Sequence, residues 1–369
     1  MRQTKPSFSW RKATESTLFF PLIAFALILL FDFVVVPGFF NIQVRDGNLY
    51  GSLIDILRNG STISLLAIGM TLVIATGGVD LSVGAVMAIA ASVAALLMNP
   101  YVLATELPPN LMKLMTDPTF TASPLVYVIL AALMVATICG LVNGVLVAYV
   151  KIQPMVATLI LMIAGRGMAQ LITNGVRIQI FYEPYAYIGQ GWNILPFCLY
   201  LVAIIYALTW LFTRKTAVGM FIESIGINAR SSFFSGISER KIKLLVYTFC
   251  GFCAGIAGLV ASANIKTSDA NNIGWSLELD AILAVVIGGT SMAGGRFSLL
   301  ASIIGAMVMQ AVTTSMYAIG VPAFALLAIK GVFVILVVRY ICFFKIRTSP
   351  DQGTGPIFSS RLTSHVRRQ

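Results

Sequence analysis

The segment that decides the fold is GMTLVIATGGVDLSVGAVMAI, residues 69–89. Two apolar runs flank a glycine pair, Gly77 and Gly78, and a single acidic residue, Asp80. Short apolar segments interrupted by glycine are typical of discontinuous membrane helices, whose free backbone ends line a cavity near the membrane midplane. The segment therefore predicts two short helices joined by a glycine turn, with a carboxylate at the joint.

A second region of the chain has the same character. It reads LAVVIGGTSMAGGRFSLLASI, residues 283–303, and contains Gly288 and Gly289 followed by a further glycine pair. The two regions are compatible with a distant internal repeat of one broken-helix unit. The alternative is that Gly, Ala and Val recur in any membrane helix, and the sequence leaves both readings open.

The composition of the whole chain places these regions in a membrane protein. Of the 369 residues, 58% are hydrophobic and only 11% are charged, whereas soluble domains carry about 25% charged residues. A hydrocarbon slab of about 30 Å takes roughly 20 apolar residues per helix. We predict an all-α integral membrane protein with about ten transmembrane helices, in the runs 18–36, 60–76, 83–98, 124–149, 155–173, 196–213, 244–263, 279–291, 298–315 and 322–343.

The basic residues predict how these helices are threaded. With alternating spans and the amino terminus inside, 18 of the 25 Lys and Arg residues fall on the inner side and five outside. Basic loops stay in the cytoplasm, so both termini are expected there. The predicted parts are a cytoplasmic tail at 1–17, a transmembrane permease domain at 18–343 and a basic cytoplasmic tail at 344–369. The net charge of +11 then needs no nucleic-acid partner.

Several kinds of chemistry have no support in the sequence. There is no GxxxxGK[ST] loop for nucleotide phosphates, no GxSxG and no HExxH. The single histidine, His365, lies in the tail, and the five cysteines lie in or beside apolar runs. We therefore predict no enzyme activity, no cofactor and no metal site in this chain. Glycines four residues apart, Gly140 with Gly144 and Gly251 with Gly255, predict close helix packing.

Ionisable residues within or beside apolar runs are the remaining candidates for function. A charge at a helix centre costs ~2.5–3.5 kcal/mol on insertion scales, so such residues usually face a partner or a wet cavity. Asp32 is expected to reach the interface at the outer end of its helix. Asp80 caps the helix that opens at Leu81 and Ser82, takes part in function, or does both.

The other membrane-depth charges carry similar alternatives. Arg166 is the best candidate for a structural ion pair, Glu278 and Asp280 suit the first turn of a helix, and Lys330 either snorkels or pairs with an acid. Our candidates for the translocation path or its gate are Gly77, Gly78, Asp80, Ser82, Arg166, Glu278, Asp280, Gly288 and Gly289.

The segment 214–243 is the longest predicted cytoplasmic stretch between spans. It mixes apolar residues such as Met220, Phe221 and Ile225 with Glu223 and basic residues. This amphipathic short-helix character predicts a docking surface for a cytoplasmic partner. The alternative is a helix that lies on the membrane surface through its basic face.

Three stretches together resemble the ribose-type permeases of bacterial ABC sugar importers: GMTLVIATGGVDLSVGAVMAI, TAVGMFIESIGINARSSFFSGI and ELDAILAVVIGGTSMAGGRFSLL. Within that family, KIQPMVATLILMIAGRGMAQLIT and SDANNIGWSLELDAILAVVIGG look most like a galactofuranose permease. The resemblance implies a permease subunit, multi-pass in the bacterial inner membrane, that forms the path for a monosaccharide such as galactofuranose or a ribose-like sugar.

The resemblance also implies the partners of the chain. These are a tandem-cassette ATPase that binds ATP and Mg²⁺, a periplasmic sugar-binding protein, and a second permease subunit in a homo- or heterodimer. By the same resemblance, the segment 214–243 is the coupling segment that docks into the ATPase, through Glu223, Gly226, Asn228, Ser235 and Gly236.

Two other classes of protein compete with this reading. A proton-coupled secondary transporter would use Asp80, Glu278 and Asp280 as titrating groups, but the chain lacks an acid and histidine relay. A membrane-embedded scaffold would need no charges at the midplane. The secondary transporter also leaves the long cytoplasmic segment unexplained.

Overall fold

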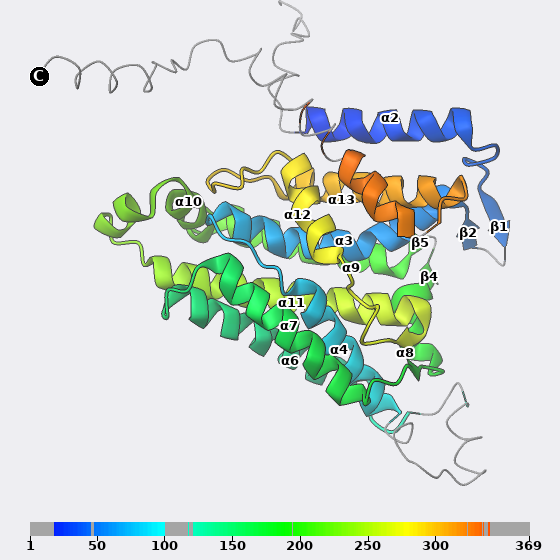
Figure 1. Cartoon of the computed structure of the whole chain (residues 1–369), viewed down its shortest axis with the longest axis horizontal. Coiled ribbons are helices and arrows are strands. Elements are labelled where there is room, and N and C mark those ends of the chain that lie inside the picture. The colour runs from blue at the N-terminus through cyan, green and yellow to red at the C-terminus, as the bar shows by residue number, and fades with distance from the viewer. Residues whose placement is uncertain are drawn as a thin grey trace, which may run out of the picture. The chain divides into compact units, whose positions relative to one another are not determined.

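A computed structural model describes residues 18–45, 48–99, 117, 121–193, 195–322, 324–333, 335 and 339. The chain divides into two compact units, Met1–Leu326 and Leu327–Gln369, and nearly all the described residues belong to the first. The first unit is helical, with short strands at connections (Figure 1). Its helices are α2 (Phe19–Val35), α3 (Ser52–Ala75), α4 (Val83–Met98), α6 (Leu125–Ala148), α7 (Pro154–Thr173), α8 (Glu183–Gln190), α9 (Phe197–Lys215), α10 (Val218–Phe234), α11 (Glu239–Ile265), α12 (Leu277–Ile287) and α13 (Leu299–Ala318).

The predicted apolar runs all correspond to helices as far as the structure describes them. Within these residues, six helices are long and apolar enough to cross a membrane: α3, α6, α7, α9, α11 and α13. The apolar helices α2, α4 and 324–333 are shorter. The fold is thus an all-α membrane protein, and the number of ten crossings and the location of the termini stay predictions.

Of the helices that we predicted to be short and broken by glycine, only some are short in the structure. The helices α4 and α12 are short, with 16 and 11 residues, but α3 runs unbroken for 24 residues. The prediction of a short second segment was wrong because α3 begins with polar residues, among them Asp55, Arg58 and Asn59. Hydropathy does not reveal these residues as helical, although other helices supply polar partners for Asn59 and for the Arg58 carbonyl.

The core of the first unit lies along α3 and α11. The most apolar stretches of α3, α11 and α13 are 83%, 67% and 61% buried, whereas those of α6, α7 and α9 are 22–28% buried. The helix α11 packs most extensively on α6 and α3. Gly140 of α6 meets Gly251 of α11 so closely that a Cβ on Gly140 would lie 2.9 Å from the Gly251 Cα atom, which confirms the predicted close packing.

The two ends of the helix bundle carry different structures (Figure 1). At one end, which we call the α10 end, α10 follows α9 after two residues and precedes α11 by four, 235–238. At the other, the α8 end, β3 (Ile178–Gln179) pairs antiparallel with β6 (Thr267–Ser268). The remaining strands form two small antiparallel pairs, β1 (Gln43–Arg45) with β2 (Asn48–Tyr50) and β4 (Trp192–Asn193) with β5 (Leu195–Pro196).

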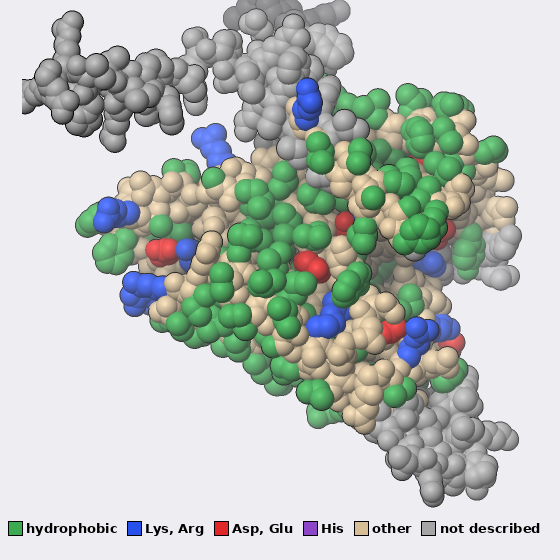
Figure 2. Space-filling view, viewed as in Figure 1, with side chains coloured by type: hydrophobic (Ala, Val, Ile, Leu, Met, Phe, Trp, Pro, Cys, Tyr) green, Lys and Arg blue, Asp and Glu red, His purple; other side chains and the backbone are tan. Residues whose placement is uncertain are grey.

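Side-chain types also separate on the surface. On the face drawn in Figure 2, Lys and Arg side chains lie over α10 and its neighbouring connections and again at the α8 end, whereas hydrophobic side chains cover the flank of α6 and α7. This exposed apolar flank suits contact with lipid or with another subunit.

Candidate functional site

Four glycines bring α10 into backbone contact with both regions that the sequence singled out. The N–H of Gly295 donates to the carbonyl of Ala75 at the end of α3, at 2.9 Å. A Cβ on Gly226 of α10 would collide with this same carbonyl and with the Gly295 nitrogen. A Cβ on Gly294 would lie 2.9 Å from the Gly226 Cα atom and 2.9 Å from the Gly77 nitrogen. We call Gly77, Gly226, Gly294 and Gly295 the glycine junction.

The other predicted glycines serve local packing and turns. A Cβ on Gly78 would collide with the hydroxyl of Tyr247 on α11. A Cβ on Gly288 would lie 2.7 Å from the nitrogen of Ser302, so Gly288 lets the end of α12 approach α13. Gly289 has a φ of +83° with open space around it, a conformation that glycine adopts without strain.

Asp80 and Ser82 form a buried polar network at the start of α4. The Asp80 Oδ1 atom accepts from the Ser82 N–H at 2.9 Å and from the Ser82 hydroxyl at 2.7 Å. The side-chain amide of Asn143 on α6 donates to Ser82 Oγ at 2.8 Å and lies 3.4 Å from Asp80 Oδ1. All three residues are buried. The N-cap of α4 is Ser82, so Asp80 holds the residue that opens the helix and does not itself occupy the cap position.

Two α11 residues that sequence reasoning missed complete this network. The thiol of Cys250 interacts with the Asp80 carboxylate, and the Tyr247 hydroxyl donates to the Val79 carbonyl at 3.4 Å. Asn143 was missed too, although a lone amide in the apolar run 124–149 is a signal that could have revealed it. Among the described residues no cation forms an ion pair with Asp80.

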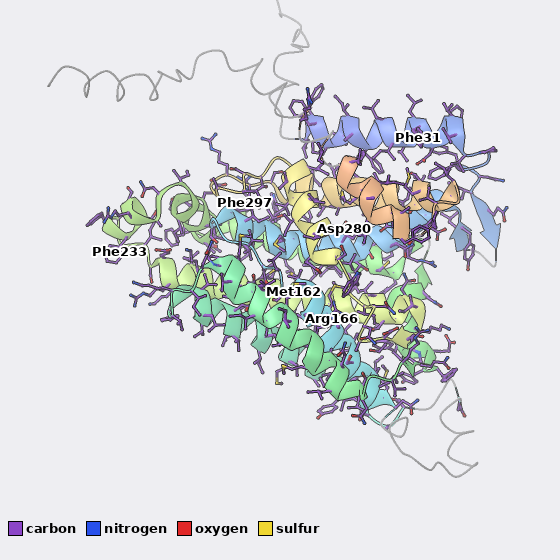
Figure 3. All side chains as sticks on the ribbon, in the orientation of Figure 1. Phe31, Met162, Arg166, Phe233, Asp280 and Phe297 are labelled. Atoms are coloured by element: carbon purple, nitrogen blue, oxygen red, sulfur yellow. The ribbon has the colours of Figure 1, made fainter. Side chains whose placement is uncertain are left out.

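Arg166 anchors the chain that leads into α12. Its Nη1 atom donates to the carbonyls of Ala270 and Ile273, at 3.0 and 2.6 Å. Glu278 is the carboxylate whose charge attracts it, without reaching ion-pair distance in the structure. Arg166 therefore forms hydrogen bonds to two backbone carbonyls, with a carboxylate nearby, and does not form the direct ion pair that we predicted. Figure 3 places Arg166 on α7 and Asp280 on α12, the helix that also carries Glu278.

Glu278 and Asp280 lie in the first turn of α12, as predicted, and both are buried. The Glu278 carboxylate lies against Gly84 of α4, where a Cβ would collide with Oε2. This Oε2 atom has no hydrogen-bond partner among the described residues. A buried acceptor without a partner is costly, ~1–3 kcal/mol.

Two further charges at predicted membrane depth lie on α2 and on the helix 324–333. Asp32 is fully buried, and its Oδ2 atom accepts from the Ser315 hydroxyl of α13 at 2.8 Å. The prediction that Asp32 reaches the interface was therefore wrong, because the side chain holds α2 against α13. Lys330 lies half-buried in the helix 324–333.

The predicted docking segment is mainly the helix α10. Asn228 has extended backbone angles, φ −158° and ψ 97°, and its Oδ1 atom accepts from the Ser231 N–H at 3.0 Å. This is the geometry of an N-cap, so Asn228 divides α10 into two helical pieces. Glu223 lies half-buried on the first piece, and Ser235 and Gly236 follow the second, Gly236 with a φ of +81°.

The outer face of α10 exposes several large apolar side chains. Ile222 and Ile225 are buried, but Met220, Ile227, Phe233 and Phe234 are 61–81% exposed. Figure 3 shows Phe233 at the far tip of the helix. Beside that tip, a polar cleft of about 1030 Å³ includes Lys151, Phe233, Gly236 and Lys243. Exposed apolar side chains next to basic ones are typical of a protein interaction site.

Charged and polar side chains tie the opposite end of the bundle together. Arg177 donates to Asp269 Oδ2 through Nε and Nη2, at 3.2 and 3.0 Å, beside the β3 and β6 pair. Burial alone raises the pKa of Asp269, but hydrogen bonds from Asn272, the Asn271 N–H and Arg177 lower it below its ordinary value overall. Asp269 is therefore ionised at neutral pH and fixes the connection between α11 and α12.

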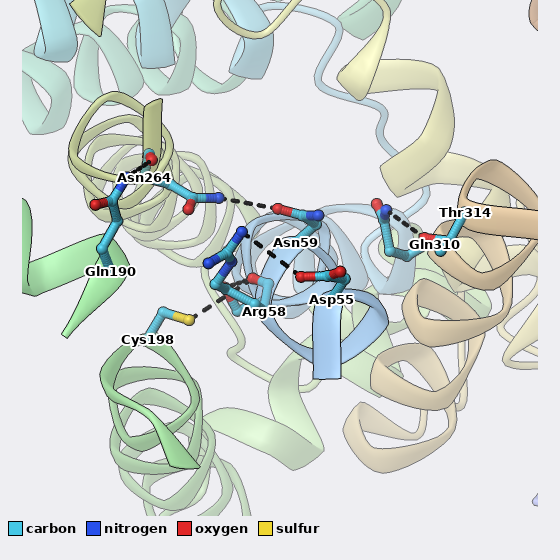
Figure 4. A network of polar contacts seen from close by, with 9 residues as sticks. Asp55, Arg58, Asn59, Gln190, Cys198, Asn264, Gln310 and Thr314 are labelled. Carbon is cyan, nitrogen blue, oxygen red and sulfur yellow. Dashed lines mark hydrogen bonds and ion pairs between the residues drawn. The ribbon is translucent and has the colours of Figure 1, made fainter. Parts of the chain in front are cut away.

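Polar contacts also surround the first half of α3 (Figure 4). Asn264 donates to Asn59 Oδ1 at 2.9 Å, and Gln190 donates to the Asn264 carbonyl at 2.5 Å. The Cys198 thiol donates to the Arg58 carbonyl at 3.6 Å. These contacts explain how a helix with polar residues lies in the centre of the bundle.

Comparisons with a family model and with known proteins all point to transport permeases. Residues 52–338 match the model of the family described as branched-chain amino acid transport system / permease component. The galactofuranose transporter permease protein YtfT of Escherichia coli (strain K12) is 47% identical over 317 residues, 86% of this chain and 87% of that protein.

Two further relatives cover the same extent. The fructose import permease protein FruF of Bifidobacterium longum (strain NCC 2705) is 38% identical over 89% of this chain and 88% of its own length. The ribose import permease protein RbsC of Escherichia coli (strain K12) is 31% identical over 86% of this chain and 91% of its own. No solved structure is significantly similar. The chain therefore belongs to this permease-component family, as one of the ribose-type permeases of ABC sugar importers.

Proposed function

We propose that the chain forms the translocation path for a monosaccharide in an ATP-driven importer of the bacterial inner membrane, with galactofuranose as the first candidate. The observation that carries this proposal is the 47% identity to the galactofuranose permease over nearly the whole chain. The fructose and ribose permeases among the relatives make other monosaccharides the alternatives to test.

The partners follow from this function. The α10 end is cytoplasmic in our proposal, and the exposed apolar face of α10 docks into a tandem-cassette ATPase that holds ATP and Mg²⁺. A periplasmic sugar-binding protein docks at the α8 end. A second permease subunit, identical or related, completes the path against the exposed flank of this chain. No cofactor or metal is needed in the chain itself.

The glycine junction supports a way to couple the ATPase to the path. Gly226 of α10 touches the end of α3 and the turn after α12 through backbone atoms alone. When the ATPase closes around ATP, it displaces α10, and the displacement passes to α3 and α12 without flexible side chains between. Asp80, Ser82 and Glu278 lie at the ends of the short helices that then rearrange.

The proposed orientation predicts which residues an impermeant thiol reagent reaches. Ser235 is exposed after α10, and Val176 is exposed after α7, close to the α8 end. In a background with Cys342→Ser, Val176→Cys is expected to react in intact spheroplasts, and Ser235→Cys only after the membrane is opened. Labelling of Ser235→Cys in intact spheroplasts would place α10 outside and remove the ATPase contact.

Transport by the reconstituted complex tests the function directly. Proteoliposomes that contain the chain, its ATPase and its binding protein are expected to accumulate radiolabelled galactofuranose only with internal ATP, and ribose or fructose more slowly. An ATPase variant that cannot hydrolyse ATP serves as control. Uptake that persists with this variant and collapses when a proton gradient is dissipated would instead show a proton-coupled secondary transporter.

A further inference from the structure

An apolar cleft of about 830 Å³ opens on the side of the bundle near the α10 end. Its walls come from α9 and α11, through residues such as Leu208, Leu211, Leu244 and Leu245, and α6 contributes Leu141. The cleft faces the surroundings of the bundle, since Leu208 and Leu211 are 58% and 49% exposed. It is separate from the glycine junction, the Asp80 network and the polar cleft beside the α10 tip.

Two lysines line the same cleft. Lys215 is the last residue of α9, and Lys241 lies in the first turn of α11. Both are exposed, and the ion pairs among the described residues include neither of them. Lys243, by contrast, pairs with Glu239 at 2.7 Å. The cleft thus has uncompensated positive charge at the α10 end and hydrocarbon along the rest of its length.

The length of the cleft fits one leaflet of a bilayer. Along α11 it extends from Lys241 to Phe252, which is roughly 16 Å at a rise of about 1.5 Å per residue. Half of a hydrocarbon core of about 30 Å is roughly 15 Å. With the lysines at the level of the lipid phosphates, the apolar part reaches the middle of the membrane.

We propose that this cleft binds an anionic phospholipid of the leaflet at the α10 end. The lipid phosphate lies between Lys215 and Lys241, and an acyl chain fills the space between α9 and α11. Basic pockets between membrane helices recognise anionic head groups in this way. A zwitterionic lipid fits less well because its own cation lies near the two lysines. The site does not depend on which sugar the complex carries.

Native mass spectrometry of the full-length chain, purified in mild detergent, tests the site with phosphatidylglycerol and phosphatidylcholine of matched chain length. The wild-type chain is expected to bind one phosphatidylglycerol in preference to phosphatidylcholine. In the double variant Lys215→Gln, Lys241→Gln the affinity for phosphatidylglycerol should fall roughly tenfold or more, since each lysine near the membrane surface attracts an anionic lipid.

A matched control is offered by the adjacent positions. Arg214→Gln with Arg240→Gln removes the same charge from the same two helix ends, but neither arginine lines the cleft. This variant should keep most of its lipid affinity. An equal loss in both double variants would show a diffuse basic surface and overturn the proposal, as would equal binding of the two lipids by the wild-type chain.

Two further variants test the apolar part of the site. Leu208→Trp fills the cleft and should weaken lipid binding while both lysines remain, at an unchanged melting temperature in detergent. Leu208→Cys tests whether another protein occupies the cleft. Efficient disulfide formation between two Leu208→Cys copies in native membranes would mean that a second copy covers it, and would overturn the lipid assignment.

Discussion

Gly226→Ala is expected to reduce sugar uptake by roughly tenfold or more while the chain still inserts into the membrane. The new Cβ collides with the Ala75 carbonyl and the Gly295 nitrogen, which hydrogen-bond to each other. Overpacking of this kind costs ~1–3 kcal/mol, and 1.4 kcal/mol corresponds to a factor of ten. Relief of the collision moves α10 away from α3, so the ATPase should continue to hydrolyse ATP without import.

Gly167→Ala provides the control for this experiment. Gly167 lies in the helix α7, and a Cβ there would have nothing within 4 Å. Alanine is about 1 kcal/mol better than glycine in a helix, so this variant should transport normally. Uptake and ATP hydrolysis are measured together in proteoliposomes at equal protein abundance. Normal uptake by Gly226→Ala would show that the close contact at the glycine junction does not transmit the movement.

Asp80→Ala is expected to abolish most uptake, whereas Asp80→Asn should retain much of it. The alanine variant leaves the Ser82 N–H and the Ser82 hydroxyl without their acceptor in a site where Asp80 is 1% exposed. Each buried donor left without a partner costs ~1–3 kcal/mol. Asparagine keeps an acceptor oxygen, and the structure shows no ion pair of Asp80 that requires its charge. We therefore expect Asp80→Ala to reduce uptake because the start of α4 no longer holds the conformation that opens the path.

Asp55→Ala is the matched control, because Asp55 lies on the surface at the opposite end of α3. Its ion pair with Arg58 is long, at 3.6 Å, and its side chain is 50% exposed. Surface pairs of this kind contribute ~0–1 kcal/mol. Uptake of each variant is corrected for its abundance in the membrane. Equal failure of Asn and Ala at position 80 would show that the negative charge is needed, and full activity of both would exclude Asp80 from the mechanism.

The sequence predicts the bounds of a helix well where all its residues are apolar or small, and poorly where polar residues begin the helix. The run 83–98 coincides with α4 because every turn of this helix is apolar or small. The start of α3 could not be predicted in the same way, since Asn59 is stabilised by Asn264, more than 200 residues later in the chain. Hydropathy in a window of sequence contains no information on a polar partner supplied by another helix.

The candidate sites show the same division. A carboxylate at a glycine turn was enough to single out Asp80 and Ser82, but their contact with Cys250 depends on how α11 packs across the turn. Likewise, the motif identified Gly77 and Gly226 separately, whereas their meeting at one point depends on the tertiary structure. The partner of Arg166 could not be predicted either. Every residue has a backbone carbonyl, so the sequence does not indicate which carbonyl accepts the hydrogen bond.

The short connections on either side of α10 limit how far it can move on its own. Two residues join it to α9 and four join it to α11, and an extended residue spans at most ~3.6 Å. The connection to α9 can therefore extend by no more than roughly 7 Å, and the connection to α11 by no more than roughly 14 Å. A larger displacement of α10 must therefore move α9 and α11 with it, so both helices follow when α10 is displaced.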